Sequence, residues 1–494
     1  MLMHIAFLNP QGNFDPNDSY WTQHPDFGGQ LVYVKELAAA LANKGHRIDI
    51  LTRQIQDPAW PEFAAPLDAY PGVDNLRIVR IPCGPPGFLR KEDLWPWLGR
   101  EWVSNILRHY RAEGGFPDVF TAHYADGGLS AALLQGQTDI PFTFTAHSLG
   151  AQKLDKLGAT PANIEELDAR FHFRQRLAAE RVAMKRAGLI ITSTRQERMM
   201  QYGHRAYRGS VDVADDNKFA VIPPGVNLRI FAHDAENNQE TTTQRYIESV
   251  LARDTPPPRR GLPLILMASR LDAKKNHIGL VRAYAQSAEL QARATLAIIL
   301  RGSDQPFRAL QRFTPEEQTL LRDIRAVIES HGLQGKVIFL ALDSQLALAA
   351  AYRYLAHRKS AFCQPAHYEP FGLAPLEAMA AGLPAVVTRN GGPAESLQDS
   401  VTGERYGVFV DPADPADIAR GLLIPLQNPA VWQRLHEAGM RRVRERYTWE
   451  QTAHGYQAAI AQLLARAEPT FLHFTYPHDF HIPLTFLQAH YFGA

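Results

Sequence analysis

Residues 362–395 read Phe-Cys-Gln-Pro-Ala-His-Tyr-Glu-Pro-Phe-Gly-Leu-Ala-Pro-Leu-Glu-Ala-Met-Ala-Ala-Gly-Leu-Pro-Ala-Val-Val-Thr-Arg-Asn-Gly-Gly-Pro-Ala-Glu. We expect a short buried strand at 360–363, followed by a loop whose two prolines exclude regular structure. A helix is predicted over 374–381, and Gly382 with a proline two residues later ends it. A second buried strand is expected at 384–388. The stretch therefore alternates strand, helix and strand, as parallel α/β sheets do.

Two carboxylates flank the start of this helix, Glu369 in the loop and Glu377 one turn inside. Between them, the backbone N–H groups of Phe371, Gly372 and Leu373 lie at a helix N-terminus, where anions bind readily. A glycosidase pair would flank one bond at roughly 5–9 Å, whereas these two acids are expected to face different parts of a long ligand. The spacing alone fits equally well with a solvated Glu369 and a Glu377 that only complements the helix dipole.

The run from Glu369 to Glu377 resembles the E-x7-E motif of retaining, nucleotide-sugar-dependent glycosyltransferases of the GT-B fold. The Pro-Phe-Gly inside the run makes this resemblance specific. The resemblance implies that Glu369 contacts the donor hexose and that Glu377 contacts the ribose of the nucleotide. It also implies that Phe371, Gly372 and Leu373 belong to the donor site.

Composition excludes several classes of function. The chain has 494 residues, 45% hydrophobic and 21% charged, which suggests two to three ordinary globular domains. A net charge of +1 gives no electrostatic case for binding nucleic acid or an anionic membrane. Two distant cysteines form no disulfide framework, and no apolar stretch approaches the ~18–20 residues that span a bilayer. Because the N-terminus also lacks a signal-peptide pattern, we expect a cytoplasmic protein.

Short apolar strands alternate with helical stretches in both halves of the chain, including one long helix expected over 164–187. We therefore predict an α/β protein with two Rossmann-like, doubly wound domains facing a cleft, with ligands at the carboxyl ends of the strands. The expected parts are an acceptor-binding domain at 1–230, a polar linker at 231–261, a nucleotide-sugar-binding domain at 262–447, and a C-terminal helix and tail at 448–494.

Two further candidates follow predicted strands. Arg270 and Lys275 close the first strand of the second half, where a guanidinium and an ammonium can clamp a diphosphate. A solvated basic loop is the plainer alternative. His147 ends the strand at 142–145, a place where a lone histidine is more often structural than catalytic. The resemblance implies that Arg270 and Lys275 neutralise the departing diphosphate and that His147 contacts the donor hexose. With Glu369, these three are the catalytic candidates.

The acceptor side is indicated by a more specific resemblance, to the sucrose-phosphate synthases. This resemblance is carried by four stretches of sequence, residues 10–15, 24–30, 147–153 and 171–176. It extends along the chain to about residue 456. Two adjacent glycines, Gly28 and Gly29, open a helix where a backbone can approach a phosphate, and both are donor-site candidates. The resemblance implies that Gly29 and Gln30 border the acceptor site.

The same resemblance implies that Lys91, Lys153 and Arg176 hold the phosphate of fructose 6-phosphate. Each of these residues by itself is more typical of a surface charge. Arg174 is a further acceptor candidate, although it lies on a different helical face from Arg176.

Two absences shape the expected reaction. The Asp-x-Asp-x-Thr motif of the phosphatase-like domain found in some relatives is missing, so we expect a product that leaves still phosphorylated and a separate sucrose phosphatase as partner. No His, Cys and Asp cluster has metal-ligand spacing, so no metal site and no required cofactor are predicted, with Mg²⁺ at most stimulatory. The nucleotide sugar is a substrate.

The resemblance thus implies transfer of glucose from a nucleoside diphosphate glucose to fructose 6-phosphate, and UDP-glucose is the donor we expect. The configuration is retained, and the product is sucrose 6-phosphate. Two alternatives stay open. A sucrose synthase would act on free fructose, and such chains usually carry a long N-terminal extension that is missing here. A non-catalytic sugar-nucleotide-binding regulator would be marked by loss of Arg270, Lys275 or Glu369, and all three are present.

Overall fold

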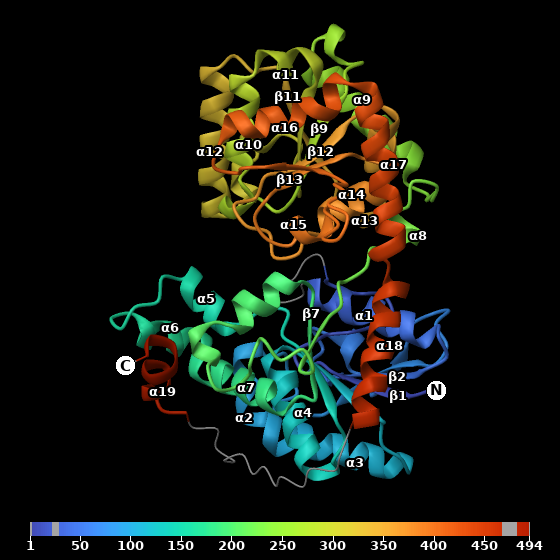
Figure 1. Cartoon of the computed structure of the whole chain (residues 1–494), viewed down its shortest axis with the longest axis vertical. Coiled ribbons are helices and arrows are strands. Elements are labelled where there is room, and N and C mark those ends of the chain that lie inside the picture. The colour runs from blue at the N-terminus through green and yellow to red at the C-terminus, as the bar shows by residue number, and fades with distance from the viewer. Residues whose placement is uncertain (1, 22–28, 467–481, 494) are drawn as a thin grey trace. The chain divides into compact units, whose positions relative to one another are not determined.

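The computed structural model of the chain describes residues 2–21, 29–466 and 482–493. The chain forms two compact units, each described here by itself (Figure 1). Unit 1 comprises Met1–Pro223 and Thr452–Ala494, and unit 2 comprises Pro224–Gln451.

Unit 1 is built on an eight-stranded sheet in the order β3-β4-β2-β1-β5-β6-β7-β8. All neighbouring strands pair in parallel except β3, which runs antiparallel to β4. The strands are β1 (His4–Leu8), β2 (Arg47–Arg53), β3 (Leu67–Ala69), β4 (Leu76–Ile81), β5 (Val119–His123), β6 (Phe142–Thr145), β7 (Leu189–Thr192) and β8 (Phe219–Val221). β3 has only three residues and lies at the edge, too short to show an alternating pattern in the sequence.

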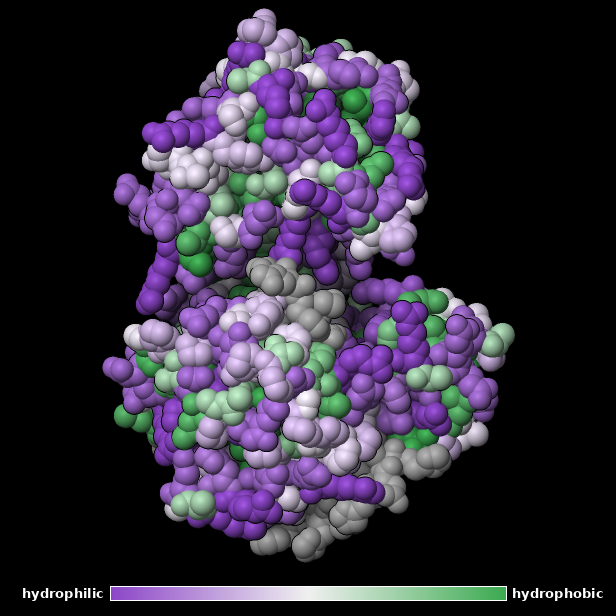
Figure 2. All heavy atoms as spheres, turned by 180° about the vertical axis from the view of Figure 1, so that it is seen from behind, coloured by the Kyte–Doolittle hydropathy of each residue, from purple (hydrophilic) through white to green (hydrophobic). Residues whose placement is uncertain are grey.

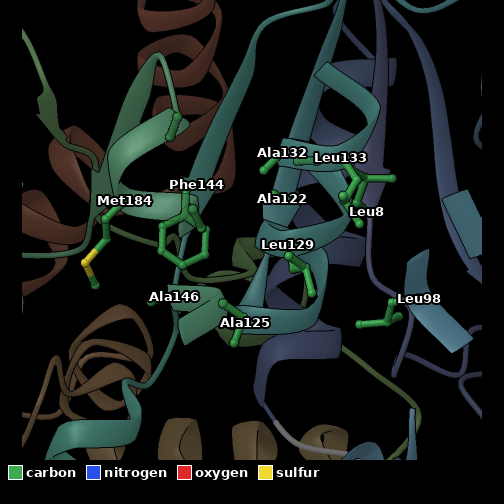
Figure 3. Packing of buried hydrophobic residues seen from close by; sticks show 14 of the residues in the cluster. Leu8, Leu98, Ala122, Ala125, Leu129, Ala132, Leu133, Phe144, Ala146 and Met184 are labelled. Carbon is green, nitrogen blue, oxygen red and sulfur yellow. The ribbon is translucent and has the colours of Figure 1, made fainter. Parts of the chain in front are cut away.

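Helices cover both faces of this sheet. They are α1 (Gly29–Ala42), α2 (Trp95–Trp97), α3 (Val103–Glu113), α4 (Tyr124–Thr138), α5 (Gly150–Lys156), α6 (Ile164–Phe171), α7 (Phe173–Arg186), the greater part of α18 (Trp449–Arg466), and α19 (Thr485–Leu487). Helix α4 forms the centre of one face: Ala125, Leu129 and Ala132 lie between Phe144 on one side and Leu8 on the other (Figure 3). This close packing needs glycine, because a Cβ at position 127 would lie 2.5 Å from the carbonyl oxygen of Leu8.

Unit 2 contains a six-stranded, wholly parallel sheet in the order β11-β10-β9-β12-β13-β14. The strands are β9 (Leu264–Ala268), β10 (Thr295–Leu300), β11 (Val337–Ala341), β12 (Ala361–Gln364), β13 (Ala385–Thr388) and β14 (Val408–Val410). Their residues are almost entirely buried, as expected for strands covered on both faces. The order reverses between β9 and β12, and at such a switch point ligands bind beyond the carboxyl ends of the strands.

Two groups of helices enclose the unit 2 sheet (Figure 1). One face packs on α8 (Leu228–Phe231), α9 (Glu240–Asp254), α13 (Gln345–His357), α14 (Leu373–Ala380) and α17 (Pro429–Arg446). The other packs on α10 (His277–Gln286), α11 (Ala288–Arg293), α12 (Pro315–Ser330) and α16 (Pro415–Gln427). The short α15 (Pro393–Ser396) follows β13. Both sheets are therefore doubly wound, and the predicted pair of Rossmann-like domains is confirmed.

Two sequence-based expectations are wrong in detail. The helix predicted over 164–187 is two helices, α6 and α7, because His172 between them has a left-handed φ of +53°. The stretch 231–261, predicted as a linker, belongs to unit 2, since α9 buries Ile247, Val250 and Leu251 in the core of that unit.

The surface carries mixed polarity. On the face drawn in Figure 2, hydrophilic residues predominate and hydrophobic ones are scattered among them. No helix within 2–21, 29–466 or 482–493 has the length and apolar character needed to cross a membrane.

Candidate functional site

The carboxylate of Glu369 lies in a loop of unit 2 and is held from two sides. Lys275 Nζ lies 2.5 Å from its Oε2, and Gln364 Nε2 donates to the same oxygen at 3.0 Å. Only 8% of Glu369 is exposed. Two predicted catalytic residues that are 94 positions apart in the chain therefore meet at the carboxyl ends of β9 and β12.

Backbone hydrogen bonds fix the Glu369 loop against the loop that follows β13. The N–H of Glu369 donates to the carbonyl of Asn390 at 3.1 Å, and the N–H of Gly392 donates to the carbonyl of Glu369 at 2.9 Å. Gly391 has a φ of +102°, and a Cβ there would lie 2.0 Å from the carbonyl oxygen of Glu369. The two glycines allow this approach, which a side chain would block.

Asn276 ties three loops of the same site together. Its Nδ2 donates to the carbonyls of Pro365 and Pro412 at 2.9 and 2.8 Å, and its Oδ1 accepts the N–H of Gly279 at 3.2 Å, capping α10. It is 3% exposed and has a left-handed φ of +64°. In the sequence only its place beside Lys275 marks it, although asparagine is a residue type that tolerates this conformation and caps helices.

Helix α14 begins at Leu373, directly after Gly372 with a φ of +93°, and no side chain among the described residues caps its first turn. Glu377 lies one turn inside and is half-buried. Its carboxylate has no hydrogen bond or ion pair within the described part of the chain, and burial raises its pKa to about 7. The side chain of Phe371 is half-buried beside the ring of Tyr447, with centroids 6.1 Å apart.

Arg270 follows β9 and differs from its neighbour Lys275. Its side chain is exposed, and it forms no hydrogen bond or ion pair with any described residue. The charge of Arg270 helps to lower the pKa of Asp272, although the hydrogen bonds and the charge of Lys274 have larger effects. The guanidinium is therefore available for a ligand at the end of β9.

His147, at the end of β6 in unit 1, is surrounded by rings. The ring of His123 lies nearly parallel to it, at an interplanar angle of 23° with centroids 5.0 Å apart, and Tyr33 meets it edge-on at 4.9 Å. Its Nε2 lies 2.8 Å from Nδ1 of His123, and its backbone has a left-handed φ of +57°. Burial lowers the pKa of His147 to about 3, so the ring is neutral near pH 7.

Lys153, on α5, lies over the ring of Phe171 with Nζ 3.9 Å from the centroid. It forms no ion pair or hydrogen bond within the described residues. Burial lowers its pKa to about 8, helped by the positive charges of Arg176, Lys91 and Arg170 and opposed by the negative charge of Glu92. Arg176 and Lys91, the other two basic residues predicted for the acceptor phosphate, therefore both act electrostatically on Lys153, and so does Arg170, which the sequence did not single out.

Arg176 is nearly buried on α7 and is held in place by several partners. Its Nε donates to Glu180 at 2.9 Å, and its Nη2 donates to the carbonyl and hydroxyl oxygens of Ser148 at 2.8 and 2.9 Å. Arg174, two residues earlier on the same helix, has other partners. It forms an ion pair with Asp168 at 2.6 Å and donates to the carbonyl of Ile482 at 3.2 Å, anchoring the C-terminal segment.

The predicted glycine-rich start of α1 is only partly described. Gly28 lies outside the described residues. Gly29 is the first residue of α1, and a Cβ there would meet no described atom within 4 Å, so packing against the described residues does not require glycine at this position. Gln30 donates from Nε2 to Oδ1 of Asn9, at the end of β1.

Asp126 is a candidate that sequence reasoning missed. It is buried in the first turn of α4, one oxygen accepts Gln11 Nε2 at 3.0 Å, and the other has no partner within the described part of the chain. Burial raises its pKa to about 6. Nδ2 of Asn9 is also buried without a described partner. An acid directly after β5 was the available signal, because polar residues at such strand ends often bind ligands.

Comparison with known proteins places the chain in a family. Two family models match it, "Glycosyl transferase 4-like domain" over residues 28–225 and "Glycosyl transferases group 1" over residues 252–442. A protein described as a probable sucrose-phosphate synthase from Thermosipho melanesiensis is 42% identical over 456 residues, covering 92% of this chain and 95% of that protein. The chain belongs to the sucrose-phosphate synthase family. It is accordingly a glycosyltransferase.

Plant members of the family are more distant and longer. The sucrose-phosphate synthase of Zea mays is 32% identical over 516 residues, covering 93% of this chain but 47% of the plant protein. Sucrose-phosphate synthase 4 of Arabidopsis thaliana gives the same identity and the same coverage. The chain thus spans about half the length of these relatives.

Solved structures show the same architecture. A sucrose-phosphate synthase from Thermosynechococcus elongatus aligns with a TM-score of 0.66 at 23% identity, covering 94% of this chain and 99% of that one. The catalytic domain of starch synthase IV from Arabidopsis thaliana, bound to ADP and acarbose, aligns with a TM-score of 0.61 at 15% identity. At these identities the likeness concerns the fold alone, and it supports the GT-B fold.

Proposed function

We propose that this family member transfers glucose from UDP-glucose to fructose 6-phosphate, with retention of configuration, and releases sucrose 6-phosphate. The observation that carries the proposal is the basic group around Lys153 in unit 1. A half-buried ammonium that forms no described ion pair, on which the positive charges of Arg176 and Lys91 act more strongly than the negative charge of Glu92, favours an anionic acceptor over a neutral one.

The acceptor phosphate is assigned to Lys91, Lys153 and Arg176. Arg176 supplies a guanidinium fixed by Glu180 and Ser148, and its Nη1 makes no hydrogen bond with described residues. A pre-oriented guanidinium loses little freedom when it binds a phosphate. Gln30 borders the same acceptor through its contact with Asn9.

The donor is assigned mainly to unit 2. Arg270 and Lys275 stabilise the negative charge that grows on the leaving diphosphate, together with the backbone N–H groups of Phe371, Gly372 and Leu373 at the start of α14. Glu377 accepts hydrogen bonds from the ribose hydroxyls. Glu369 contacts the hexose. The half-buried ion pair with Lys275 orients the Glu369 carboxylate for this contact.

Retention follows a front-face path. The bond between the anomeric carbon and the diphosphate oxygen breaks, and positive charge grows on the sugar. The acceptor hydroxyl oxygen forms its bond to that carbon on the same face, and its proton passes to the leaving phosphate oxygen. Two effects lower the activation free energy: electrostatic stabilisation of the leaving group and orientation of the acceptor. His147 of unit 1 contacts the donor hexose.

We also propose the conditions under which the protein works. The reaction requires no cofactor, with Mg²⁺ at most stimulatory, and the protein works in the cytoplasm beside a separate sucrose phosphatase. The part of the chain that the structure describes contains no group of three or more His, Cys, Asp or Glu side chains arranged to hold a metal ion.

The test is a matrix of two acceptors and three donors. Purified protein is incubated with fructose or fructose 6-phosphate, each with UDP-, ADP- and GDP-glucose, and the glycosidic product is measured. The proposal expects the highest rate with fructose 6-phosphate and UDP-glucose. A higher kcat/KM for free fructose would contradict it, and so would the absence of product from every pair.

A further inference from the structure

Unit 1 contains a buried histidine, His123, that the proposed reaction does not use. It closes β5, and its Nδ1 lies 2.8 Å from Nε2 of His147. Phe7 stacks on the ring of His123 with centroids 5.4 Å apart, while Tyr33 packs edge-on against His147. Packing on both rings fixes their planes, so the contact between the two nitrogens is a defined hydrogen bond.

A row of threonines sets the direction of this bond. Thr143 Oγ1 donates to Thr121 Oγ1 at 2.9 Å, and Thr121 Oγ1 lies 3.4 Å from Nε2 of His123. The Thr121 oxygen can accept a second proton and can also donate its own. Nε2 of His123 is the other described partner of this hydroxyl, and the relay proposed below has the hydroxyl donate to it. A neutral imidazole carries one N–H, so the proton of His123 is then on Nδ1. That N–H faces Nε2 of His147, which must accept.

Burial removes the alternative of a second proton on either ring. It lowers the pKa of His123 well below its ordinary value, and it lowers that of His147 to about 3. The proton of His147 is therefore on Nδ1, which has no hydrogen-bond partner within the described residues.

The backbone gives an independent indication that this corner is specialised. His147 has a φ of +57° and Tyr124, next to His123, has a φ of +66°. Left-handed conformations are uncommon for residues other than glycine and cluster at functional sites, where the surrounding structure enforces them. Two left-handed residues, Tyr124 and His147, lie beside the hydrogen bond between His123 and His147. This backbone is consistent with a His147 side chain that is held in one orientation.

We propose that His123 is a positioning residue: through the relay Thr143–Thr121–His123 it fixes His147 with its proton on Nδ1, so that His147 donates a hydrogen bond to an oxygen of the donor hexose. The inference rests on the proposed function only for the identity of that oxygen. The direction of the relay concerns this chain's own residues.

The first test needs no substrate. Protein labelled with ¹⁵N at histidine is studied by NMR at pH 7, and the His147 signals are assigned with the His147→Gln variant. The expected result is a neutral His147 ring protonated at Nδ1. A ring protonated at Nε2, or at both nitrogens, overturns the proposal. Because the spectrum is independent of turnover, a wrong acceptor or donor assignment would not affect it.

The second test links the relay to the reaction. Thr121→Val removes the hydroxyl that directs His123, and Thr192→Val is the matched control, since Thr192 is a buried strand residue of the same sheet whose hydroxyl has no described partner. Loss of one neutral hydrogen bond corresponds to a fall in kcat of about 2- to 12-fold for Thr121→Val.

We expect KM for fructose 6-phosphate to stay unchanged in both variants and kcat to stay unchanged in the control. Thermal unfolding of the two variants separates a folding defect from a positioning effect. Unchanged His147 signals in Thr121→Val overturn the relay, and changed signals with an unchanged kcat overturn the positioning role.

Discussion

The two lysines assigned to phosphates, Lys275 in unit 2 and Lys153 in unit 1, differ in their counter-charges. In unit 2, Lys275 is already paired with Glu369 at 2.5 Å. In unit 1, Lys153 has no described counter-ion and instead lies over the face of Phe171, among other positive charges. An anion in unit 2 must compete with a carboxylate for the ammonium, whereas an anion in unit 1 relieves repulsion. We infer that the unit 1 group mainly supplies affinity and the unit 2 group mainly supplies catalysis.

The largest effect is expected from removing the unit 2 cations. Arg270→Ala or Lys275→Ala should lower kcat by at least about 10²-fold, because each removes one stabiliser of the leaving diphosphate. Steady-state kinetics with UDP-glucose and fructose 6-phosphate measures the effect. Lys274→Ala is the control, since the exposed side chain of this neighbour pairs, among the described residues, with Asp272 alone, at 3.1 Å. A near wild-type kcat in both Arg270→Ala and Lys275→Ala would contradict the claim that the unit 2 cations supply catalysis.

The unit 1 cations should act on affinity instead. Lys153→Met should raise KM for fructose 6-phosphate by about 10- to 150-fold, the value of a charge-assisted bond to a phosphate, and leave KM for the donor unchanged. Arg174→Ala is the control, because Arg174 pairs with Asp168 and Ile482. If Arg174→Ala raised KM for fructose 6-phosphate as much as Lys153→Met does, the phosphate would have to be assigned to residues of α6 and the start of α7.

Arg176→Ala gives the same kinetic expectation but also a stability cost. It leaves Glu180 buried without its ion pair, and breaking such a pair costs about 3–5 kcal/mol. A lower melting temperature should therefore accompany the higher KM, which makes Lys153 the cleaner residue for testing affinity.

The two carboxylates of unit 2 should differ in kind. Glu377→Ala should raise KM for the donor about 10-fold through loss of hydrogen bonds from the ribose, with kcat little changed. Glu369→Ala should lower kcat as well, since it removes the proposed contact to the hexose and the carboxylate that holds Lys275 in position. Unchanged donor kinetics in both variants would favour the reading in which the acids only complement the helix dipole.

The smallest effect concerns stability and pH. Burial raises the pKa of Glu377 to about 7 from an unfolded value near 4.5, so the folded protein binds more protons than the unfolded one between these values. Its contribution to stability is therefore lost as pH rises from 4.5 to 7. Glu377→Gln should remove this loss and stabilise the protein at pH 8 by at most about 3 kcal/mol. Denaturant unfolding at pH 5 and pH 8 measures it, and an equal gain at both pH values would contradict the assignment.

The same comparison explains what the sequence could reveal. The unit 2 motif is continuous from Glu369 to Glu377, so its strand, loop and helix could be predicted closely. The residues around Lys153 come from separate segments, and only the family resemblance grouped them. The ion pair between Lys275 and Glu369 spans 94 positions, and no local pattern encodes it. The left-handed His172 that splits α6 from α7 was hidden because apolar residues continue at helical spacing on both sides.

The most direct test of the central claim is the ratio of kcat/KM for fructose 6-phosphate to kcat/KM for fructose, with UDP-glucose as donor, in the wild type and in Lys153→Met. We expect a wild-type ratio far above 1 that falls by about 10- to 150-fold in the variant, while kcat/KM for fructose stays nearly the same. A wild-type ratio below 1, or a ratio that the substitution does not move, would contradict the assignment of a phosphate site to unit 1.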